Sequence, residues 1–382
     1  MTFKVANIIA HFNAESGGPP RTVSQIAAAG KGHWRAALYT TDYVESAADR
    51  LLVEEFPGHV DVEPVGFGTT LSALSMMAGL RRRHRMQPLE GADVVHIHGV
   101  WSPYLAAVAL TAIRSRIPVV VTPHGMLEPW SLGVGATRKW FAMSVYQRKI
   151  LARASALHAT SKMEAANLRR LDVGAVPVFI VPNPVDEPPP PDEASLPRIG
   201  GKRVLLFLSR LHEKKGLDIL LQAWNEIRPP QWRLLIVGSG DQNYVARLKQ
   251  FCVSHDVPDV GFQSHVDGQL REAIFRQASA FILPTYSENF GNVIAEALMR
   301  GLPVVTTTGT PWSEIVEEKC GWYIEPTVSA LKRAIAEVTA TDSHTLRQMG
   351  ARGREFASSH FTLPVVGKAF LNMYRSAIEG RA

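Results

Sequence analysis

Short apolar runs recur along the chain and alternate with segments of helical pattern. The runs are continuous rather than alternating in polarity, which is typical of parallel strands buried on both faces. Strands of this kind, separated by helices, form doubly wound α/β sheets. The sequence therefore predicts two α/β units, with strands at 5–10, 94–98, 119–122, 156–159 and 178–181 in the first and at 204–208, 233–237, 281–284, 303–306 and 321–324 in the second.

A proline-rich stretch at 182–197 separates the two sets of runs. Its proline density disfavours hydrogen-bonded structure and predicts a semi-rigid connector. A chain of 382 residues is also longer than one core usually supports. We expect a first domain at 1–187 and a second at 198–360, followed by a helix at 361–382 with Phe370 and Tyr374 on one face.

The overall charge is basic, with 41 Lys and Arg against 35 Asp and Glu, a net charge of +6. Basic charge favours nucleic acid, anionic lipid or phosphorylated ligands. Because the sequence has no RNA-binding signature or zinc-finger spacing, we expect no nucleic-acid partner. The two cysteines fit no metal or disulfide pattern, and no secretory signal or membrane-spanning run is evident. These features predict a cytoplasmic protein.

The segment 287–298 combines two carboxylates with a predicted helix start. Glu288 lies in a short polar loop after a predicted strand, and Glu296 lies in the helix that follows. Free N–H groups at a helix start favour anions, so a phosphate is expected near Phe290, Gly291 and Asn292. The two carboxylates would instead accept hydroxyl groups, of a sugar at Glu288 and of a ribose at Glu296. The pattern predicts a nucleotide-sugar site.

Other candidate ligand-binding residues follow predicted strands, where ligands of α/β sheets bind. Gly17 and Gly18 follow the first strand and suit either a phosphate contact or a tight turn. Arg210 and Lys215 suit a diphosphate, although a solvated turn is the alternative. His124 follows the strand at 119–122, where a lone histidine is more often structural than catalytic. Each of these residues can contact a ligand only if the ends of the strands before them lie close together in the folded sheet.

Two further patterns have simpler interpretations. His96 and His98 align on one face of their strand, and no third ligand for zinc is obvious. We expect His98 to line a crevice and His96 to lie in the core. Gly238 and Gly240 lack the third glycine of a dinucleotide fingerprint and predict a tight turn.

Several motifs in order resemble the retaining glycosyltransferases of family 4, which have the GT-B fold and an E-x7-E motif. The motifs are G-G-P-P-R at 17–21, H-I-H-G at 96–99, T-P-H-G-M at 122–126, S-R-L-H-E-K-K-G at 209–216, V-G-S-G at 237–240 and the segment 287–298. The resemblance implies two Rossmann-like domains facing each other across a donor-binding cleft. It also implies that the last helix crosses back to the first domain. In this family the positions of Arg210 and Lys215 hold the donor pyrophosphate, and the position of His124 lies beside the transferred sugar.

Two segments, 71–85 and 138–149, place basic residues beside apolar ones. This arrangement suits an anionic membrane surface, and an ordinary helix with a solvated basic face is an equal alternative. We expect peripheral contact with the cytoplasmic face of the inner membrane, where a lipid-carried acceptor is reached.

The chemistry that the resemblance implies is retaining transfer of a hexose-type sugar. The donor would be UDP- or GDP-linked, and the acceptor a polyprenyl-diphosphate-linked glycan or an oligosaccharide. The sequence has no Asp-x-Asp, so we expect no metal and no cofactor, with Arg210 and Lys215 supplying positive charge. Glu288 and His124 complete the expected catalytic set. The alternatives are an epimerase or hydrolase of the same fold, a non-catalytic nucleotide-sugar-binding protein and, less favoured, a pyridoxal-phosphate phosphorylase.

Overall fold

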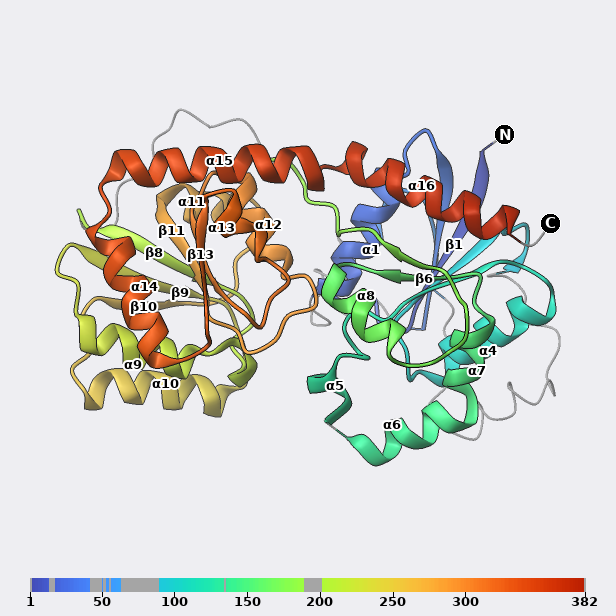
Figure 1. Cartoon of the computed structure of the whole chain (residues 1–382), viewed down its shortest axis with the longest axis horizontal. Coiled ribbons are helices and arrows are strands. Elements are labelled where there is room, and N and C mark those ends of the chain that lie inside the picture. The colour runs from blue at the N-terminus through green and yellow to red at the C-terminus, as the bar shows by residue number, and fades with distance from the viewer. Residues whose placement is uncertain are drawn as a thin grey trace. The chain divides into compact units, whose positions relative to one another are not determined.

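The chain divides into two compact units, Met1–Pro184 with Leu363–Ala382, and Val185–Thr362. The computed structural model describes residues 2–13, 18–41, 50, 53–54, 56–62, 89–133, 135–188 and 201–380. Each unit holds one parallel sheet flanked by helices (Figure 1). The prediction of two doubly wound α/β units is confirmed.

The first unit contains a sheet of seven strands in the order β3-β2-β1-β4-β5-β6-β7. Its strands are β1 (Phe3–Ile9), β2 (Trp34–Thr40), β3 (His59–Val62), β4 (Val94–His98), β5 (Val119–Thr122), β6 (Ala156–Ala159) and β7 (Val178–Ile180). Its helices are α1 (Gly18–Ala29), α4 (Pro103–Arg114), α5 (Pro129–Gly133), α6 (Ala136–Ala142), the π-helix η3 (Met143–Gln147), α7 (Arg148–Arg153), α8 (Lys162–Arg169) and α16 (Leu363–Glu379).

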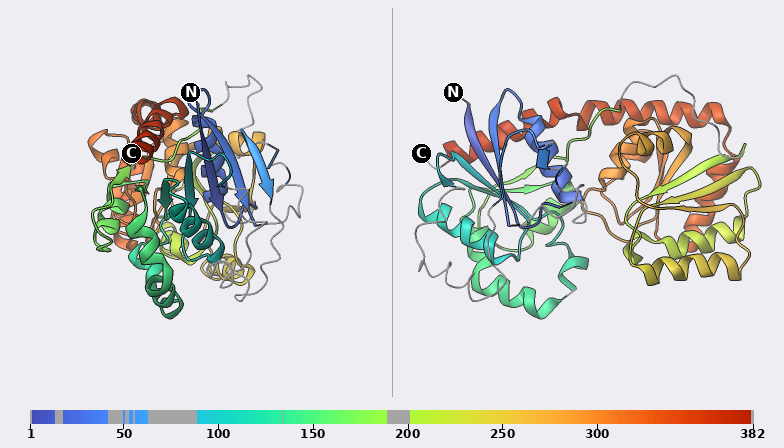
Figure 2. Two further views of the ribbon diagram at one scale, coloured as in Figure 1. Left: turned by 90° about the vertical axis from the view of Figure 1, so that its right-hand side faces the viewer. Right: turned by 180° about the vertical axis from the view of Figure 1, so that it is seen from behind.

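Apolar residues cover both faces of this sheet, which explains why its strands are continuous apolar runs. One face packs against α1 and α16 through Val23, Ile26 and Phe370. The other face packs against α4, α7 and α8 through residues such as Leu105, Leu151 and Leu168. Figure 2 shows the same layers from two further sides.

The second unit contains a sheet of six strands in the order β10-β9-β8-β11-β12-β13. Its strands are β8 (Arg203–Leu208), β9 (Trp232–Val237), β10 (Val260–Gln263), β11 (Ala278–Leu283), β12 (Val304–Thr307) and β13 (Gly321–Ile324). Its helices are the 3-10 turn η4 (Glu213–Lys215), α9 (Leu217–Ile227), α10 (Gln242–Ser254), α11 (Gly268–Gln277), α12 (Asn292–Met299), α13 (Glu314–Glu317), α14 (Val328–Ala340) and α15 (Ser343–Phe361).

The strand order of each sheet reverses direction once. In the first sheet the reversal lies between β1 and β4, and in the second between β8 and β11. Loops that leave the carboxyl ends of two such neighbouring strands part to opposite faces of the sheet and leave a crevice there. The topology therefore marks the loops after β8 and β11 as the place to look for a ligand site in the second unit.

All ten predicted strands are present, and three strands were missed. β2 carries the exposed Arg35, β3 is a four-residue edge strand, and β10 is interrupted by Gly261. Each lies on the same side of its sheet, toward or at the edge formed by β3 or β10. Each of these runs is broken by a polar or glycine residue, Arg35, Asp61 or Gly261, so it lacks the continuous apolar pattern of the other strands.

We predict that Gly367→Ala destabilises the first unit by about 1–3 kcal/mol, because a Cβ at Gly367 would lie 2.3 Å from the Ala29 carbonyl oxygen at the end of α1. Calorimetric unfolding of the full chain measures the effect. Gly133→Ala in α5 is the matched control, since a Cβ there meets nothing within 4 Å. Equal stability of the two variants would contradict the close packing of α16 on α1.

Candidate functional site

The loop after β8 lies directly against the turn after β9. A Cβ at Gly238 would lie 1.9 Å from the Ser209 carbonyl oxygen, and one at Gly240 would lie 1.9 Å from that of Leu211. The Leu211 amide also donates to Ser239. These contacts clamp the backbone on both sides of Arg210, whose side chain is exposed. The V-G-S-G turn thus positions Arg210, as expected for a tight turn.

The same loop is joined further on to the end of β11. Gly216 has φ 69°, and a Cβ there would lie 2.1 Å from the Pro284 carbonyl oxygen. The Lys214 carbonyl accepts hydrogen bonds from the Tyr286 amide, at 2.8 Å, and from the Thr285 hydroxyl, at 2.9 Å. The loops after β8 and β11 are therefore held together by backbone hydrogen bonds and close contact.

This contact between the two loops brings together Lys215 and Glu288, two predicted site residues that are 73 positions apart. The Lys215 ammonium donates to the Glu288 carboxylate, and the two side chains are only 14% and 13% exposed. The backbone of Glu288 is fixed as well, because its amide donates to the Gly309 carbonyl at 2.8 Å. The sequence predicted both residues but did not predict that they pair with each other.

The helix α12 begins immediately after this pair. Its N-cap is Gly291, with φ 80° and no side chain to cap the helix, and Asn292 is its first residue. The side chain of Phe290 is buried and packs against Trp312, with ring centroids 5.2 Å apart. Any ligand contact of Phe290 therefore comes from its backbone.

Glu296 lies deeper than its predicted role suggests. It is 4% exposed, and its carboxylate accepts from the Arg271 guanidinium of α11, which is itself 8% exposed. A buried carboxylate needs such a partner, because desolvating an unpaired charge is costly. Arg271 was missed from the sequence, where no motif distinguishes it from other helix arginines.

In the first unit, His124 follows β5 in a strained conformation. It has φ 51°, and Gly125 after it has φ 74°. The Gly125 amide donates to Glu164 at 2.9 Å, and the same buried carboxylate accepts from the Thr160 amide at 2.7 Å. Glu164 thus holds the turn that carries His124. It was missed because it reads as an ordinary first-turn residue of α8, capped by Ser161.

His124 belongs to a cluster of four histidines. Its Nε2 lies 3.1 Å from His98 Nδ1, and His98 Nε2 lies 3.1 Å from Asn7 Oδ1. His98 is 2% exposed, so the prediction that it lines a crevice is wrong, while His96 lies in the core as expected. The rings of His96 and His98 lie with their centroids 4.0 Å apart, tilted by 39°.

A second chain of hydrogen bonds links His96 to His158, which sequence analysis missed. Thr122 Oγ1 lies 2.6 Å from His96 Nε2 and 2.7 Å from His158 Nδ1. His158 Nε2 lies 2.7 Å from the Val181 carbonyl, and His96 Nδ1 lies 2.8 Å from the Tyr374 hydroxyl of α16. Residues from both ends of the chain therefore meet inside the first sheet.

The interior keeps these imidazoles neutral. Burial, with the neighbouring histidines, lowers the pKa of His96 and His98 well below the ordinary value of 6.5. Burial, assisted by His158, lowers the pKa of His124 to about 3. Burial also lowers the pKa of His158 to about 4, against an opposing hydrogen bond to Val181.

The N-terminus of α1 offers few donors to an anion. Gly18 is exposed and begins the helix, but Pro19 and Pro20 follow it and carry no backbone N–H. Two of the amides that a phosphate would use at a helix start are therefore missing. Gly17, the other predicted glycine, lies outside the described residues.

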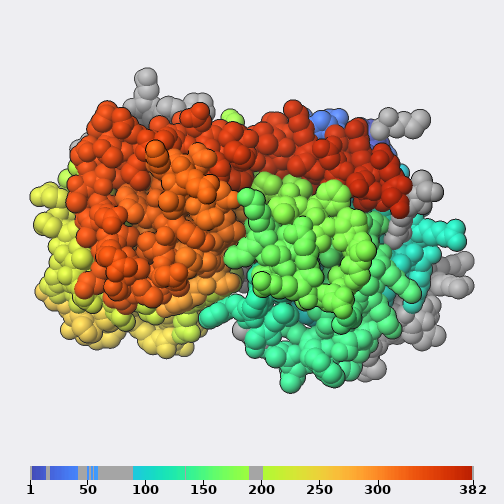
Figure 3. Space-filling view, in the orientation of Figure 1, coloured from blue at the N-terminus to red at the C-terminus, as the bar shows by residue number. Residues whose placement is uncertain are grey.

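The segment around α6 and η3 exposes large apolar side chains. Trp140 is 72% exposed, Phe141 62% and Val145 39%, and Trp130 of α5 is 49% exposed. In Figure 3 this segment, teal to green, lies at the surface of its unit. The predicted basic segment 71–85 lies outside the described residues.

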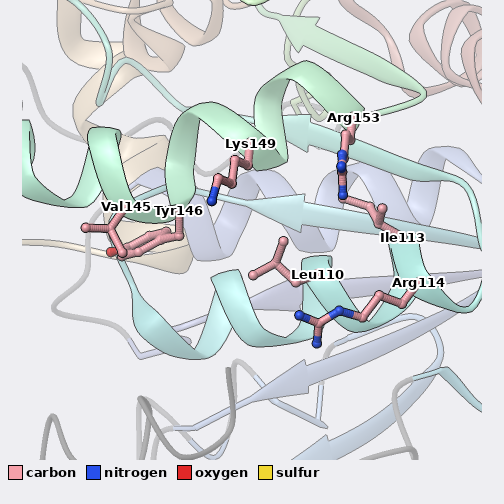
Figure 4. Close-up of a pocket in the computed structure, with 7 residues that line it drawn as sticks. All are labelled: Leu110, Ile113, Arg114, Val145, Tyr146, Lys149 and Arg153. Carbon is pink, nitrogen blue, oxygen red and sulfur yellow. The ribbon is translucent and has the colours of Figure 1, made fainter. Parts of the chain in front are cut away.

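A hollow of about 340 Å³ opens beside this segment, between α4 and the helices η3 and α7 (Figure 4). Its lining combines aliphatic and aromatic side chains with three cations. The residues are Leu110, Ile113, Arg114, Val145, Tyr146, Lys149 and Arg153. No acidic side chain is among them.

The described residues form neither a cluster of metal ligands nor a helix suited to cross a membrane. Within residues 2–380, gaps excluded, no three His, Cys, Asp or Glu side chains are grouped so that they could hold a metal ion. In the same part of the chain, no helix has the length and apolar character needed to span a bilayer.

We predict that the first unit loses stability as the pH falls from about 6.5 toward about 4. The four cluster histidines have lowered pKa values when folded, so the unfolded chain binds more protons below pH 6.5. Each such proton contributes a slope of about 1.4 kcal/mol per pH unit. Calorimetry across this range measures the slope, which His158→Gln should reduce by about one proton. A transition temperature independent of pH would contradict neutral burial.

Comparisons with known proteins agree with this geometry. A family model described as "Glycosyl transferase 4-like domain" matches residues 17–184, and one described as "Glycosyl transferases group 1" matches residues 202–341. The phosphatidyl-myo-inositol mannosyltransferase of Mycobacterium leprae is 26% identical over 330 residues, which cover 82% of this chain and 81% of that protein.

Two further similarities differ in extent. The alpha-1,3/1,6-mannosyltransferase alg2 of Schizosaccharomyces pombe is 24% identical over 220 residues, which are 50% of this chain and only 44% of that protein. The crystal structure of Anabaena HepE with UDP and glucose has a TM-score of 0.79 at 21% identity, covering 98% of this chain and 100% of that one. This likeness shows a common fold, the GT-B architecture that the sequence resemblance implied. The chain belongs to the group 1 glycosyltransferases and is an enzyme of glycosyl transfer.

Proposed function

We propose that this glycosyltransferase moves a hexose-type sugar from a UDP- or GDP-linked donor to a glycan acceptor, with retention of the anomeric configuration. The observation that carries the proposal is the convergence of Arg210, Lys215 and Glu288 where the order of the second sheet reverses. HepE, which shares the fold, is named as a complex with UDP and glucose, and two relatives are named as mannosyltransferases. Both nucleotides therefore remain candidates.

The charges at this position suit a diphosphate. Arg210 is exposed, and its fork can bind two phosphate oxygens. The N-terminus of α12 has no side-chain cap, so its amides and the helix dipole favour an anion. Lys215 adds a second positive charge. Two cations and a helix terminus match the charge of a nucleoside diphosphate.

The Lys215–Glu288 pair gives the donor a defined effect on the site. A diphosphate competes with Glu288 for the Lys215 ammonium, because both are anions that accept its hydrogen bonds. Binding of the donor then releases the Glu288 carboxylate, which can accept hydroxyl groups of the sugar. Glu296, held by Arg271, is proposed to contact the ribose.

The reaction we propose uses no metal and no further cofactor. The bond between the anomeric carbon and the donor phosphate oxygen breaks, and the acceptor oxygen bonds to that carbon on the same face. The departing phosphate oxygen takes the acceptor proton. Arg210 and Lys215 stabilise the charge that develops on the diphosphate, and His124 contributes a hydrogen bond near the transferred sugar.

The acceptor we propose is carried on a lipid, and the first unit contacts an anionic membrane at the cytoplasmic face. The exposed Trp140, Phe141 and Val145 can enter the interface between headgroups and acyl chains. The hollow beside them is lined by apolar and aromatic side chains together with the cations Arg114, Lys149 and Arg153 (Figure 4). This chemistry fits the phosphate and proximal acyl chain of an anionic amphiphile.

The donor site predicts nucleotide binding without metal. Calorimetric titration with UDP and GDP in the presence of a chelator should show preference for one nucleotide. The Arg210→Ala, Lys215→Ala double variant should weaken that binding by about a hundredfold or more, since each of the two charged hydrogen bonds contributes about 1.5–3 kcal/mol. A chelator that abolishes transfer would overturn the metal-independent mechanism.

Two controls separate specific binding from a loss of positive charge. The Lys332→Ala, Arg333→Ala variant removes two cations from α14 in the same unit and should bind as the wild type does. Glu288→Gln removes the competitor of the diphosphate, so it should leave nucleotide affinity unchanged or raised while transfer falls by about a hundredfold. Weaker nucleotide binding by Glu288→Gln would contradict the proposed competition.

The membrane contact predicts co-sedimentation with phosphatidylglycerol vesicles, weakened by salt, and little binding to phosphatidylcholine. Trp140→Ser with Phe141→Ser should lower vesicle binding by more than about tenfold, because burying one such side chain contributes about 1.5–3 kcal/mol. Val253→Ser with Val316→Ser, two exposed positions of the second unit, is the matched control. Binding without preference for anionic lipid would count against the contact.

A further inference from the structure

The hydrogen bonds that run from the Ala37 carbonyl through Asn7 and His98 to His124 fix which ring nitrogens carry protons. The starting point is a group that can only accept. The Ala37 backbone carbonyl is an acceptor only, and Asn7 Nδ2 donates to it at 3.2 Å. Asn7 is fully buried. With the amide turned the other way, Oδ1 would face the carbonyl oxygen with no proton between them, which is costly in the interior. Asn7 Oδ1 therefore points to His98 as an acceptor.

The proton positions on His98 and His124 follow from the Asn7 acceptor. Because Asn7 Oδ1 accepts, the proton in that contact belongs to His98 Nε2, 3.1 Å away. A neutral imidazole carries one proton, so His98 Nδ1 is an acceptor. The proton between His98 Nδ1 and His124 Nε2, 3.1 Å apart, then belongs to His124 Nε2. The other ring nitrogen of His124, Nδ1, has no proton.

The chain holds only if both imidazoles are neutral, and the surroundings enforce this. His98 is 2% exposed, and the His96 ring lies 4.0 Å from it. Burial first, and the neighbouring histidines second, lower the pKa of His98 well below its ordinary value. A charged His98 would also have to donate from both nitrogens beside other buried imidazoles.

A second series of hydrogen bonds, from the Val181 carbonyl through His158 and Thr122 to His96, determines the tautomer of His96 in the same way. The Val181 carbonyl accepts from His158 Nε2, so His158 Nδ1 accepts from the Thr122 hydroxyl. Thr122 in turn accepts from His96 Nε2, and His96 Nδ1 accepts from the Tyr374 hydroxyl. Every proton in this chain is assigned, so no imidazole of the cluster has a spare proton to pass to His124.

We propose that Asn7 and His98 are positioning residues that hold His124 as the Nε2–H tautomer, so that His124 Nδ1 accepts a hydrogen bond from a hydroxyl group of the sugar substrate. The assignment of the ligand rests on the proposed function, whereas the assignment of the tautomer does not. A carbonyl or a fully ionised phosphate cannot donate to this nitrogen. The bare Nδ1 therefore requires a hydrogen-bond donor as its partner, which a sugar hydroxyl supplies, and His124 cannot act as a general acid through this nitrogen.

The tautomer is tested by long-range proton–nitrogen NMR of the full chain labelled with 15N-histidine, at neutral pH. His124→Asn identifies the His124 signals by their loss. We expect a protonated Nε2 and a bare Nδ1 at His124 in the wild type. A proton on Nδ1, or a doubly protonated ring, overturns the proposal. Asparagine tolerates the positive φ of position 124, so we expect this variant to fold and to identify the His124 signals.

The role of Asn7 is tested with two variants. Asn7→Asp puts a carboxylate against His98 Nε2–H, which favours a doubly protonated His98 that donates from Nδ1, so it should shift the His124 proton to Nδ1. Asn7→Leu removes the acceptor and should give a mixture of tautomers. If transfer is measured, Asn7→Leu should lower kcat by about tenfold, as for one hydrogen bond, while the dissociation constant for UDP or GDP is unchanged. A single tautomer in Asn7→Leu would overturn the positioning role.

The hydroxyl partner is tested with UDP-glucose and GDP-mannose analogues in which single hydroxyls are replaced by fluorine, which cannot donate. One analogue should reduce kcat/KM of the wild type by about tenfold and have no such effect in His124→Ala. Equal penalties in both proteins would overturn the hydroxyl assignment. Absence of nucleotide binding and of transfer would instead refute the proposed function, while the NMR result would still stand.

Discussion

Backbone-to-backbone contact between loops is the constraint on which the candidate donor site depends. The loop after β8 is pressed against Pro284 at Gly216 and against the turn after β9 at Gly238 and Gly240. Any side chain at these positions would overlap a carbonyl oxygen, so the contact exists only because glycine is there. This contact fixes the backbone on either side of Arg210 and Lys215, and the Lys215–Glu288 pair then forms across the two loops.

The two units solve the problem of polar groups in an α/β sheet in opposite ways. The second unit keeps its functional groups charged and pairs them, as in Lys215–Glu288 and Arg271–Glu296. The first unit keeps four imidazoles neutral and satisfies them with hydroxyls, an amide and backbone carbonyls. Charged groups suit a site that must attract an anion. Neutral groups in fixed tautomers suit a site that must orient a hydrogen bond without adding net charge.

Much of the fold was predictable because its strands are buried on both faces. The strand at 94–98, for example, is fully buried along its length and was predicted with its observed bounds. β2, β3 and β10 were missed because a polar or glycine residue interrupts each of them: Arg35, Asp61 and Gly261. The site residues near glycine-rich loops could be predicted from local spacing.

What could not be predicted were the partners. Arg271 for Glu296, Glu164 for the His124 turn and His158 in the cluster come from elements distant in sequence. None of the three belongs to a motif that distinguishes it, because Arg271 and Glu164 lie in ordinary helices and His158 lies within a strand. Nor does the local sequence show that Glu288 and Lys215 pair, because they meet only where the loops after β8 and β11 contact each other.

The path of the chain has a consequence for the order in which the protein can be built. The chain leaves the first unit at Pro184 and returns to it only at Leu363, after the whole of the second unit. Tyr374, the partner of His96, and Phe370, which packs beside α1, arrive with α16. On the ribosome the second unit can therefore be finished first, although domains generally fold from the N-terminus onward. Until α16 emerges, the apolar face that it covers is open and His96 Nδ1 lacks its Tyr374 partner, so the unfinished unit exposes apolar surface of the kind that chaperones bind.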